Sequence, residues 1–258
     1  MSTALVTGAT AGIGLAFCRE LAERGHDLVL VARDRVRLEN VSDELSATYK
    51  VGAEILAADL SDRAQVQRVA DRLADATRPV DLLVNNAGFG MSHSFLGGEL
   101  ADEERMLDVL CRAVLVLSHA AALPMRARGH GAVVNVSSVA GFVPMGTYAA
   151  AKAWCTAFTE VLASELAGSG VTATALCPGF THTELHARAD LDMSRLPDFL
   201  WLEADRLVRD CLDDVSAGKV VSVPGAQYKL MVGALQVLPR GLVRRASGTV
   251  ASVRRRRG

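Results

Sequence analysis

Short apolar runs alternate with longer amphipathic stretches along this chain as far as residue 223. This alternation predicts right-handed β-α-β crossovers and therefore a parallel sheet with helices on both faces. The chain is expected to be an α/β protein with a doubly wound parallel sheet in a single domain. The expected strands are 4–6, 28–32, 54–58, 80–84, 132–136, 172–176 and 219–223, and the expected helices are 14–23, 36–48, 66–74, 102–123 and 148–167.

Composition agrees with strands that are buried on both faces. Half of the 258 residues are hydrophobic and only 5% are aromatic, as expected where helices cover a parallel sheet. No run approaches the roughly 18 uncharged apolar residues of a membrane span, and no signal peptide is visible. The five cysteines are scattered and form no CxxC pair. They predict reduced thiols, a cytoplasmic location and no metal site.

The C-terminal part of the chain is strongly basic. No acidic residue follows Asp214, whereas nine lysines and arginines do: Lys219, Lys229, Arg240, Arg244, Arg245 and Arg254 to Arg257. We therefore expect the domain at residues 1–228 and a basic extension at 229–258. The favoured interpretation is an apolar segment, 231–243, docked on the body or on a partner subunit, followed by a solvated end. The alternative is contact with an anionic membrane surface; no recognition motif supports nucleic-acid binding.

A glycine-rich turn follows the first expected strand and leads into a helix. Its sequence, Thr7-Gly8-Ala9-Thr10-Ala11-Gly12-Ile13-Gly14, has the spacing GxxxGxG. Glycines permit a tight turn and a close backbone approach, and the helix N-terminus presents N–H groups to an anion such as a pyrophosphate. An ordinary strand-to-helix connection is the alternative, but the position between strand and helix favours phosphate binding.

A second group of residues follows the expected strand 132–136. That strand runs into Ser137 and Ser138, and Tyr148 and Lys152 open the next helix one turn apart on one face. A tyrosine–lysine pair of this spacing is common on solvated helices. Ligands of open α/β sheets, however, bind beyond the carboxyl ends of the strands. The position therefore favours a catalytic pair.

These segments, in this order, resemble the short-chain dehydrogenase/reductase family from about Thr3 to Thr183. The resemblance also rests on Asp59, on Asn85-Asn86-Ala87-Gly88 and on the segment 177–183. It implies a Rossmann fold, a nicotinamide cofactor and a substrate lid at about 180–200. For the two asparagines a purely structural role is equally open. The implied cofactor contacts are Gly8, Thr10, Gly12, Ile13, Gly14, Arg33, Asp59, Leu60, Asn86, Ala87, Gly88, Tyr148, Lys152, Pro178, Gly179, Thr181 and Thr183.

The resemblance implies a catalytic role for Ser138, Tyr148 and Lys152. Hydride transfer to a carbonyl builds negative charge on oxygen, which needs a hydrogen-bond donor and then a proton. A phenol, with a pKa of roughly 10, is a poor base at neutral pH, and a neighbouring ammonium favours its ionised form. Tyr148 would be the general acid/base, Lys152 its activator and Ser138 the donor to the substrate oxygen.

Two features depart from the family pattern. Ser138 and Tyr148 are ten positions apart, fewer than the family usually has, so either the loop is trimmed or Ser137 takes part; we favour Ser138. The long helix usually carries an asparagine that orders a water near the lysine, and alignment puts Leu110 there. The usual proton relay is therefore in question, whereas hydride transfer is not.

The end of the second strand favours NADP(H) over NAD(H), although NAD(H) is not excluded. Ala32 stands where NAD-dependent members usually carry an acid, and Arg33, with help from Arg37, can pair with a 2′-phosphate. Asp34 could be the acid that NAD binding needs, but we expect it to cap the next helix.

The expected activity is carbonyl–alcohol interconversion on a small, apolar substrate, in a homodimer or homotetramer. Aromatic residues and methionines near the expected pocket favour an apolar substrate. A cofactor-binding sensor with impaired catalysis is the alternative function. An epimerase or dehydratase of the same fold is disfavoured, because no second substrate domain is present.

Overall fold

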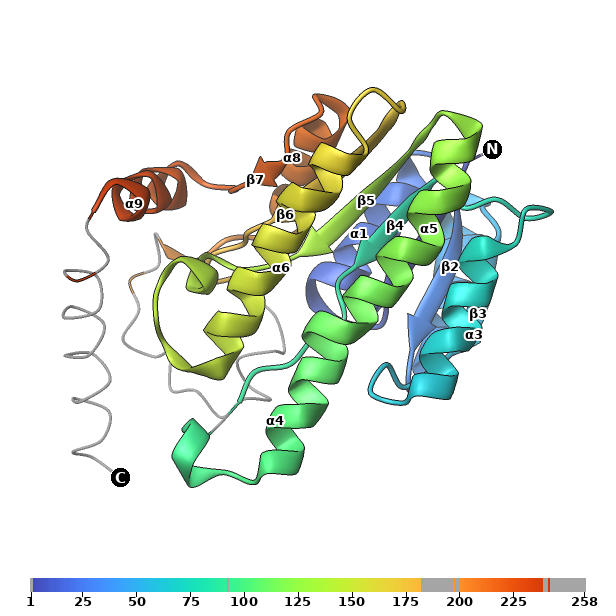
Figure 1. The fold of residues 1–258 in the computed structure, drawn as a ribbon. Helices are drawn as coiled ribbons and strands as arrows, with labels where there is room; N and C mark the ends of the chain where they lie inside the picture. The colour runs from blue at the N-terminus through green and yellow to red at the C-terminus, as the bar shows by residue number, and fades with distance from the viewer. Residues whose placement is uncertain (1, 92, 182–196, 198–199, 239–240, 242–258) are drawn as a thin grey trace.

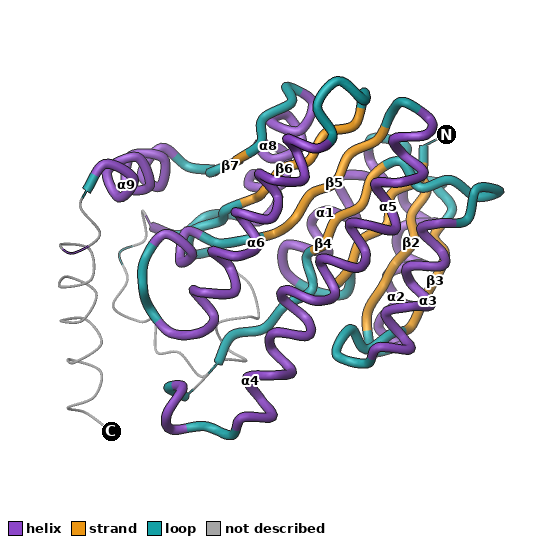
Figure 2. The backbone as a smooth tube through the Cα atoms, in the orientation of Figure 1, coloured by secondary structure: helices purple, strands orange, loops and turns teal. Residues whose placement is uncertain are grey.

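The computed structural model describes residues 2–91, 93–181, 197, 200–238 and 241. Among these residues, seven parallel strands form one sheet in the order β3-β2-β1-β4-β5-β6-β7. Helices cover both of its faces (Figures 1 and 2). This confirms the predicted doubly wound parallel sheet. The strands are β1 Thr3–Thr7, β2 Asp27–Ala32, β3 Ala53–Ala57, β4 Leu82–Asn85, β5 Gly131–Val136, β6 Val171–Leu176 and β7 Val221–Ser222.

The helices include two that the sequence analysis did not assign, α8 and α9. The α-helices are α1 Gly12–Glu23, α2 Arg35–Tyr49, α3 Arg63–Ala74, α4 Leu100–Leu107, α5 Val114–Arg128, α6 Gly146–Glu165, α8 Ala204–Ser216 and α9 Ala226–Val237. Short 3₁₀ helices lie at η1 Phe95–Gly97 and η3 Val139–Phe142, and a π-helical segment, η2 Asp108–Ala113, joins α4 to α5. The boundary expected after residue 228 falls inside α9.

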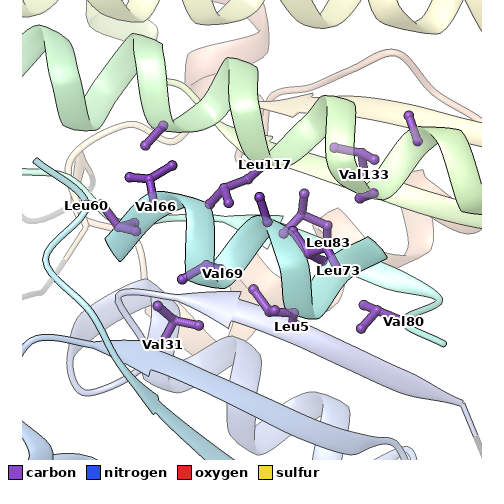
Figure 3. Packing of buried hydrophobic residues seen from close by; sticks show 14 of the residues in the cluster. Leu5, Val31, Leu60, Val66, Val69, Leu73, Val80, Leu83, Leu117 and Val133 are labelled. Atoms are coloured by element: carbon purple, nitrogen blue, oxygen red, sulfur yellow. The ribbon is translucent and has the colours of Figure 1, made fainter. Parts of the chain in front are cut away.

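Each face of the sheet has its own apolar core. Successive strand residues point to opposite faces, so Leu5 and Val6, both fully buried, belong to different clusters. Leu5 lies with Val69 of α3 and Leu117 of α5 (Figure 3), and Val6 belongs to the cluster that contains Phe17 of α1. Because both faces are buried, the strands read as continuous apolar runs, and the sequence pattern predicted them well.

The longest helical stretch, Leu100–Arg128, passes through α4, η2 and α5. By length and composition it could cross a membrane, and it is the one such helix in the described part of the chain. Half of its most apolar window is buried within the fold, where Leu117 and Met125 are fully covered. Its apolar character is thus explained by packing against α3 and the sheet.

The winding of the sheet reverses between β1 and β4. From β1 the chain proceeds to β2 and β3 on one side, whereas β4 to β7 follow on the other. The loops that leave β1 and β4 therefore diverge over opposite faces and leave a crevice at the carboxyl ends of the strands. The glycine-rich turn and the Asn86–Gly88 segment lie at this reversal.

Candidate active site

The turn from β1 to α1 leaves the start of α1 open to an external anion. Gly8 and Gly12 have φ angles of +69° and +54°, which favour glycine. Ala11 is the N-cap of α1 and offers no side-chain hydrogen bond, whereas Asp34 and Asp62 cap α2 and α3 through their carboxylates. The first N–H groups of α1 thus lack the side-chain acceptor that α2 and α3 have.

Asn86 ties the end of β4 to this turn. Its side-chain Nδ2 donates to the Thr7 carbonyl at 2.9 Å, and the backbone N–H groups of Asn86 and Ala87 donate to Thr7 Oγ1 at 2.9 and 3.0 Å. A Cβ on Gly8 would come within 2.7 Å of Asn86 Nδ2, and one on Gly14 within 2.2 Å of the Gly8 carbonyl oxygen. Both positions therefore require glycine for reasons of space.

Asn85 belongs to a buried polar network. Its Nδ2 donates to Asn135 Oδ1 at 2.9 Å and to Ser118 Oγ at 3.1 Å, and Asn135 in turn donates to Thr159 Oγ1 at 3.0 Å. These bonds connect β4, β5, α5 and α6 in the interior. Of the two roles considered for Asn85, the geometry supports the structural one.

Tyr148 and Lys152 lie together at the start of α6. Lys152 is only 5% exposed, and its Nζ donates to the Val136 carbonyl at the end of β5 at 2.7 Å. The same Nζ lies 5.7 Å from the centroid of the Tyr148 ring. A buried ammonium needs polar partners. The Val136 carbonyl and the Tyr148 ring are the neighbours that hold the Lys152 ammonium in this position.

The two serines after β5 have different environments. Ser137 is 2% exposed; its Oγ donates to the Lys152 carbonyl at 2.6 Å and lies 2.7 Å from Thr156 Oγ1. Ser138 is half-buried at the start of η3, where its Oγ accepts the N–H of Ala140 at 3.1 Å. Ser137 therefore fastens β5 to α6, and Ser138 keeps a hydroxyl that can still donate.

The short connection between Ser138 and Tyr148 is packed tightly on α6. A Cβ on Gly141 would lie 2.9 Å from the backbone nitrogen of Ala153. The short connection thus has η3 in direct contact with the helical turn that carries Lys152.

Leu110, which the alignment places at the position of the family's asparagine, lies close to Gly88, as Lys152 does. It belongs to η2, is 1% exposed and is part of the apolar core. A Cβ built on Gly88 would be 2.8 Å from Leu110 Cδ2 and 3.7 Å from Lys152 Nζ. The apolar Leu110 side chain and the Lys152 ammonium thus both lie close to the backbone of Gly88.

Asp59 follows β3 and lies near two positive charges, those of Arg33 and Arg105. The sequence analysis named Asp59 and Arg33 but not Arg105. Burial raises the pKa of Asp59, but hydrogen bonds from Ser61 and the charges of Arg105 and Arg33 outweigh it and hold that pKa below its usual value. Arg105 of α4 lies 3.7 Å from Asp59 Oδ2, and its guanidinium is 6.0 Å from the Phe89 ring centroid. Arg105 was missed because nothing local relates it to the end of β3.

The segment after β6 is held by α9. Tyr228, 2% exposed, accepts the Phe180 N–H at 3.0 Å and donates to the Leu200 carbonyl at 2.6 Å. Its ring lies over Gly179, where a Cβ would meet it at 2.0 Å. Thr181 is buried and its hydroxyl donates to the Gly179 carbonyl at 3.1 Å. No sequence motif pointed to Tyr228.

Several expected features lie outside the described residues. These are Thr183, most of the segment 180–200 expected as a lid, and the chain beyond residue 241.

Comparison with known proteins matches this arrangement to one family. Residues 2–194 match the family model described as short chain dehydrogenase. Galactitol 2-dehydrogenase (L-tagatose-forming) of Cereibacter sphaeroides is 34% identical, over 92% of this chain and 93% of its own. Sulfoacetaldehyde reductase 2 of Chromohalobacter salexigens is 38% identical over 70% of this chain and 73% of its own.

Solved structures agree in both fold and sequence. A short-chain dehydrogenase from Sphingobium yanoikuyae in complex with NADPH has a TM-score of 0.84 and 37% identity, covering 92% of this chain and 94% of its own. The bulky-bulky ketone specific alcohol dehydrogenase from Comamonas testosteroni has a TM-score of 0.78 and 30% identity, covering 93% and 96%. The sheet, the glycine turn and the tyrosine–lysine pair thus occur in a chain that belongs to the short-chain dehydrogenase/reductase family.

Proposed function

We propose that the protein is an NADP(H)-dependent oxidoreductase that interconverts a carbonyl and a secondary alcohol on a small, apolar substrate. One observation carries this proposal: the buried Lys152 ammonium lies between the Val136 carbonyl and the Tyr148 ring, at the carboxyl end of the sheet. A sensor without catalysis has no need to keep a buried cation beside a phenol, because burying a charge is costly.

The residues divide the work of proton transfer. Tyr148 holds the proton that the substrate oxygen gains on reduction, and Ser138 donates a second hydrogen bond to that oxygen. Lys152 places a positive charge near the phenol, which stabilises negative charge on it. Leu110 excludes water from the inner side of the lysine, so protons exchange from the side that faces the crevice.

The residues at the reversal of the sheet fit a dinucleotide. The start of α1 has no side-chain cap, and the turn before it packs too closely for a Cβ on Gly8 or Gly14; a tight glycine turn that leads into an uncapped helix start suits a pyrophosphate. Asp59 and Leu60 would border the adenine, and Asn86, Ala87 and Gly88 would line the ribose side. Pro178 and Gly179, with Thr181 and Thr183, would flank the nicotinamide. When bound, the cofactor supplies or accepts the hydride.

The preference for NADP(H) rests on Arg33. This residue is exposed at the end of β2, while Asp34 is engaged in capping α2, accepting the Arg37 N–H at 3.1 Å. We expect Arg33→Ala to lose roughly ten- to a hundredfold in kcat/KM with NADPH and little with NADH, as a charge-assisted contact of about 1.5–3 kcal/mol implies. Arg35→Ala is the matched control, since Arg35 is exposed and pairs with Glu39 on α2. Equal losses with both cofactors would refute the preference.

The catalytic assignment is tested by Tyr148→Phe. Turnover of a carbonyl panel, followed by NADPH absorbance, should fall by on the order of 10²-fold or more, while the affinity for NADPH stays within a few-fold. If the wild type binds NADPH tightly but turns over no member of the panel, the sensor alternative gains support. Apolar side chains near the site, including Phe89 and the Phe180–Trp201 ring pair at 6.2 Å, favour ketones with apolar groups in that panel.

We also propose a homodimer or homotetramer built through the outer side of α5 and α6. Exposed apolar side chains occur on and beside these helices: Leu107 at the end of α4, Leu115 on α5 and Val161 on α6. They accompany a hollow of about 440 Å³ lined in part by Leu107, Leu115 and Trp154. Leu115→Arg should shift the mass measured by light scattering to that of a smaller species; an unchanged mass would exclude this face.

A cytoplasmic location is proposed from the cysteines. All five are free, and burial raises the pKa of Cys111 and of Cys177 to about 11. Such thiols are unreactive and suit a reducing compartment.

A further inference from the structure

The C-terminal helix α9 packs on the body through one face. Tyr228 and Val232, one turn apart, are 2% and 5% exposed and form a cluster with Cys177 of the β6 end and Val223 of the β7 end. Contacts with η3 complete this interface. In Figure 1 the helix lies at the edge of the molecule, beyond β7.

The opposite face of α9 is apolar and exposed. Leu230 and Val237 are 77% and 86% exposed, and Met231 and Leu238 are also open to solvent. Lys229 is the one charged residue within the helix. A helix that is apolar on all sides is normally covered on all sides. We call these four side chains the α9 outer face.

The neighbouring helix α8 shows what a solvated helix of this protein looks like. It buries Leu207 and Cys211, among others, and six of its thirteen residues are aspartate or arginine. The α9 outer face has no comparable polar cover. Its exposure is therefore not a general property of the helices in this part of the chain.

Charge identifies the partner of this face. No acidic residue follows Asp214, and seven arginines follow α9 in sequence, the first of them Arg240. A second copy of the chain would bring two such cationic segments together, and their repulsion disfavours a self-interface there. Nucleic acid would satisfy the arginines but not the apolar side chains.

We propose that the α9 outer face docks the protein on an anionic lipid surface, which also attracts the positive charge that the sequence carries after α9. Apolar burial and attraction to anionic headgroups act together in such contacts, and each alone is weak. The inner face of the same helix holds Phe180 and Leu200 through Tyr228, so the docking surface and the candidate substrate site share one element.

The test is co-sedimentation of the full chain with vesicles of phosphatidylcholine alone and of phosphatidylcholine with phosphatidylglycerol. Wild type should bind the anionic vesicles at least tenfold more tightly, with affinity falling as salt rises. Val237→Glu and Leu230→Glu should each weaken binding several-fold and together at least tenfold. Leu96→Glu is the matched control, because Leu96 is as exposed as Val237, at 86%, but lies on η1.

A second variant, with Arg254 to Arg257 changed to serine, should also lose affinity for the anionic vesicles while turnover of a soluble carbonyl is unchanged. Equal binding to both vesicle types, no binding to either, or binding that survives the double glutamate variant would overturn the proposal. A drop in oligomer mass in Val237→Glu would instead assign the face to a second copy. Displacement from the vesicles by duplex DNA at equal charge would assign the arginines to nucleic acid. Either result also overturns the proposal. Circular dichroism of each variant excludes misfolding as the cause.

Discussion

Replacing Tyr228 with phenylalanine removes two hydrogen bonds and little else. The hydroxyl accepts from Phe180 N–H at 3.0 Å and donates to the Leu200 carbonyl at 2.6 Å, while the ring stays over Gly179. Net contributions of about 0.5–1.5 kcal/mol per bond give about 1–3 kcal/mol of lost stability. For a chain of about 250 residues, each kcal/mol of lost stability lowers Tm by about 2–4 °C. A loss of about 2 kcal/mol therefore lowers Tm by about 4–8 °C.

The loss should also reach the candidate site. Phe180 and Gly179 follow Pro178 in the segment proposed to flank the nicotinamide, so Tyr228→Phe should lower kcat or raise KM for the carbonyl several-fold. The proposed adenosine contacts, Arg33 after β2 and Asp59 after β3, lie on the other side of the reversal of the sheet. Affinity for adenosine 2′,5′-bisphosphate, measured by calorimetry, should therefore be unchanged.

The control is Tyr49→Phe on α2, far along the chain from this segment. An unchanged Tm in Tyr228→Phe would show that the two hydrogen bonds contribute nothing measurable. A loss of nucleotide affinity equal to the loss of turnover would show a general loosening of the fold, and the positioning role would be wrong.

Four further variants test the candidate site and the connection between α8 and β7. Leu110→Asn should unfold about 1–3 kcal/mol more easily in a denaturant titration, because it buries an amide in an apolar cluster; unchanged stability would reveal a polar partner beside Lys152. Ser137→Ala should lower Tm, because its buried hydroxyl contacts Lys152 and Thr156, whereas Ser138→Ala loses one partly exposed hydrogen bond, so it should lower Tm less and lose on the order of 10²-fold in turnover; the reverse pattern would exchange the two serines. Burial raises the pKa of Asp214, but hydrogen bonds from the Lys219 ammonium and the Ser222 hydroxyl outweigh this effect and hold the pKa below its usual value. The stabilisation is thus present above the pKa of an unfolded aspartate and is lost as pH falls through the folded value, so Asp214→Asn should be less stable than wild type at pH 7 and equal to it in acid. A constant difference across that range would contradict this account.

Local sequence was enough to predict the central sheet and the proximity of Tyr148 and Lys152. Strands such as 28–32 are short apolar runs because helices cover both faces, and that pattern is visible without a structure. Tyr148 and Lys152 are one turn apart, so their common face follows from helix geometry alone. Asp34 was expected to cap α2, and the structure shows this hydrogen bond.

Contacts between distant segments could not be predicted in this way. Tyr228 meets Phe180 across 48 positions of the chain, and Arg105 meets Asp59 across 46. Neither residue belongs to a periodic pattern or a motif. The helix α9 was missed for a related reason: it is apolar on both faces, so it lacks the amphipathic periodicity by which helices are recognised.

Three violations of local rules converge on the same edge of the sheet. Ala11 is a poor N-cap residue, although α2 and α3 have aspartates in that position. Lys152 is a buried cation whose ammonium donates to a backbone carbonyl, that of Val136. Gly88 is an exposed glycine that cannot accept a side chain without meeting Leu110. Each choice costs stability by itself, and sequences tolerate such costs mainly at functional sites. An uncapped helix start can bind a phosphate, and a buried cation can stabilise a phenolate. An exposed glycine lets the nicotinamide ring come close to the backbone. That coincidence favours a site which binds cofactor and turns over, since a structural role explains none of the three.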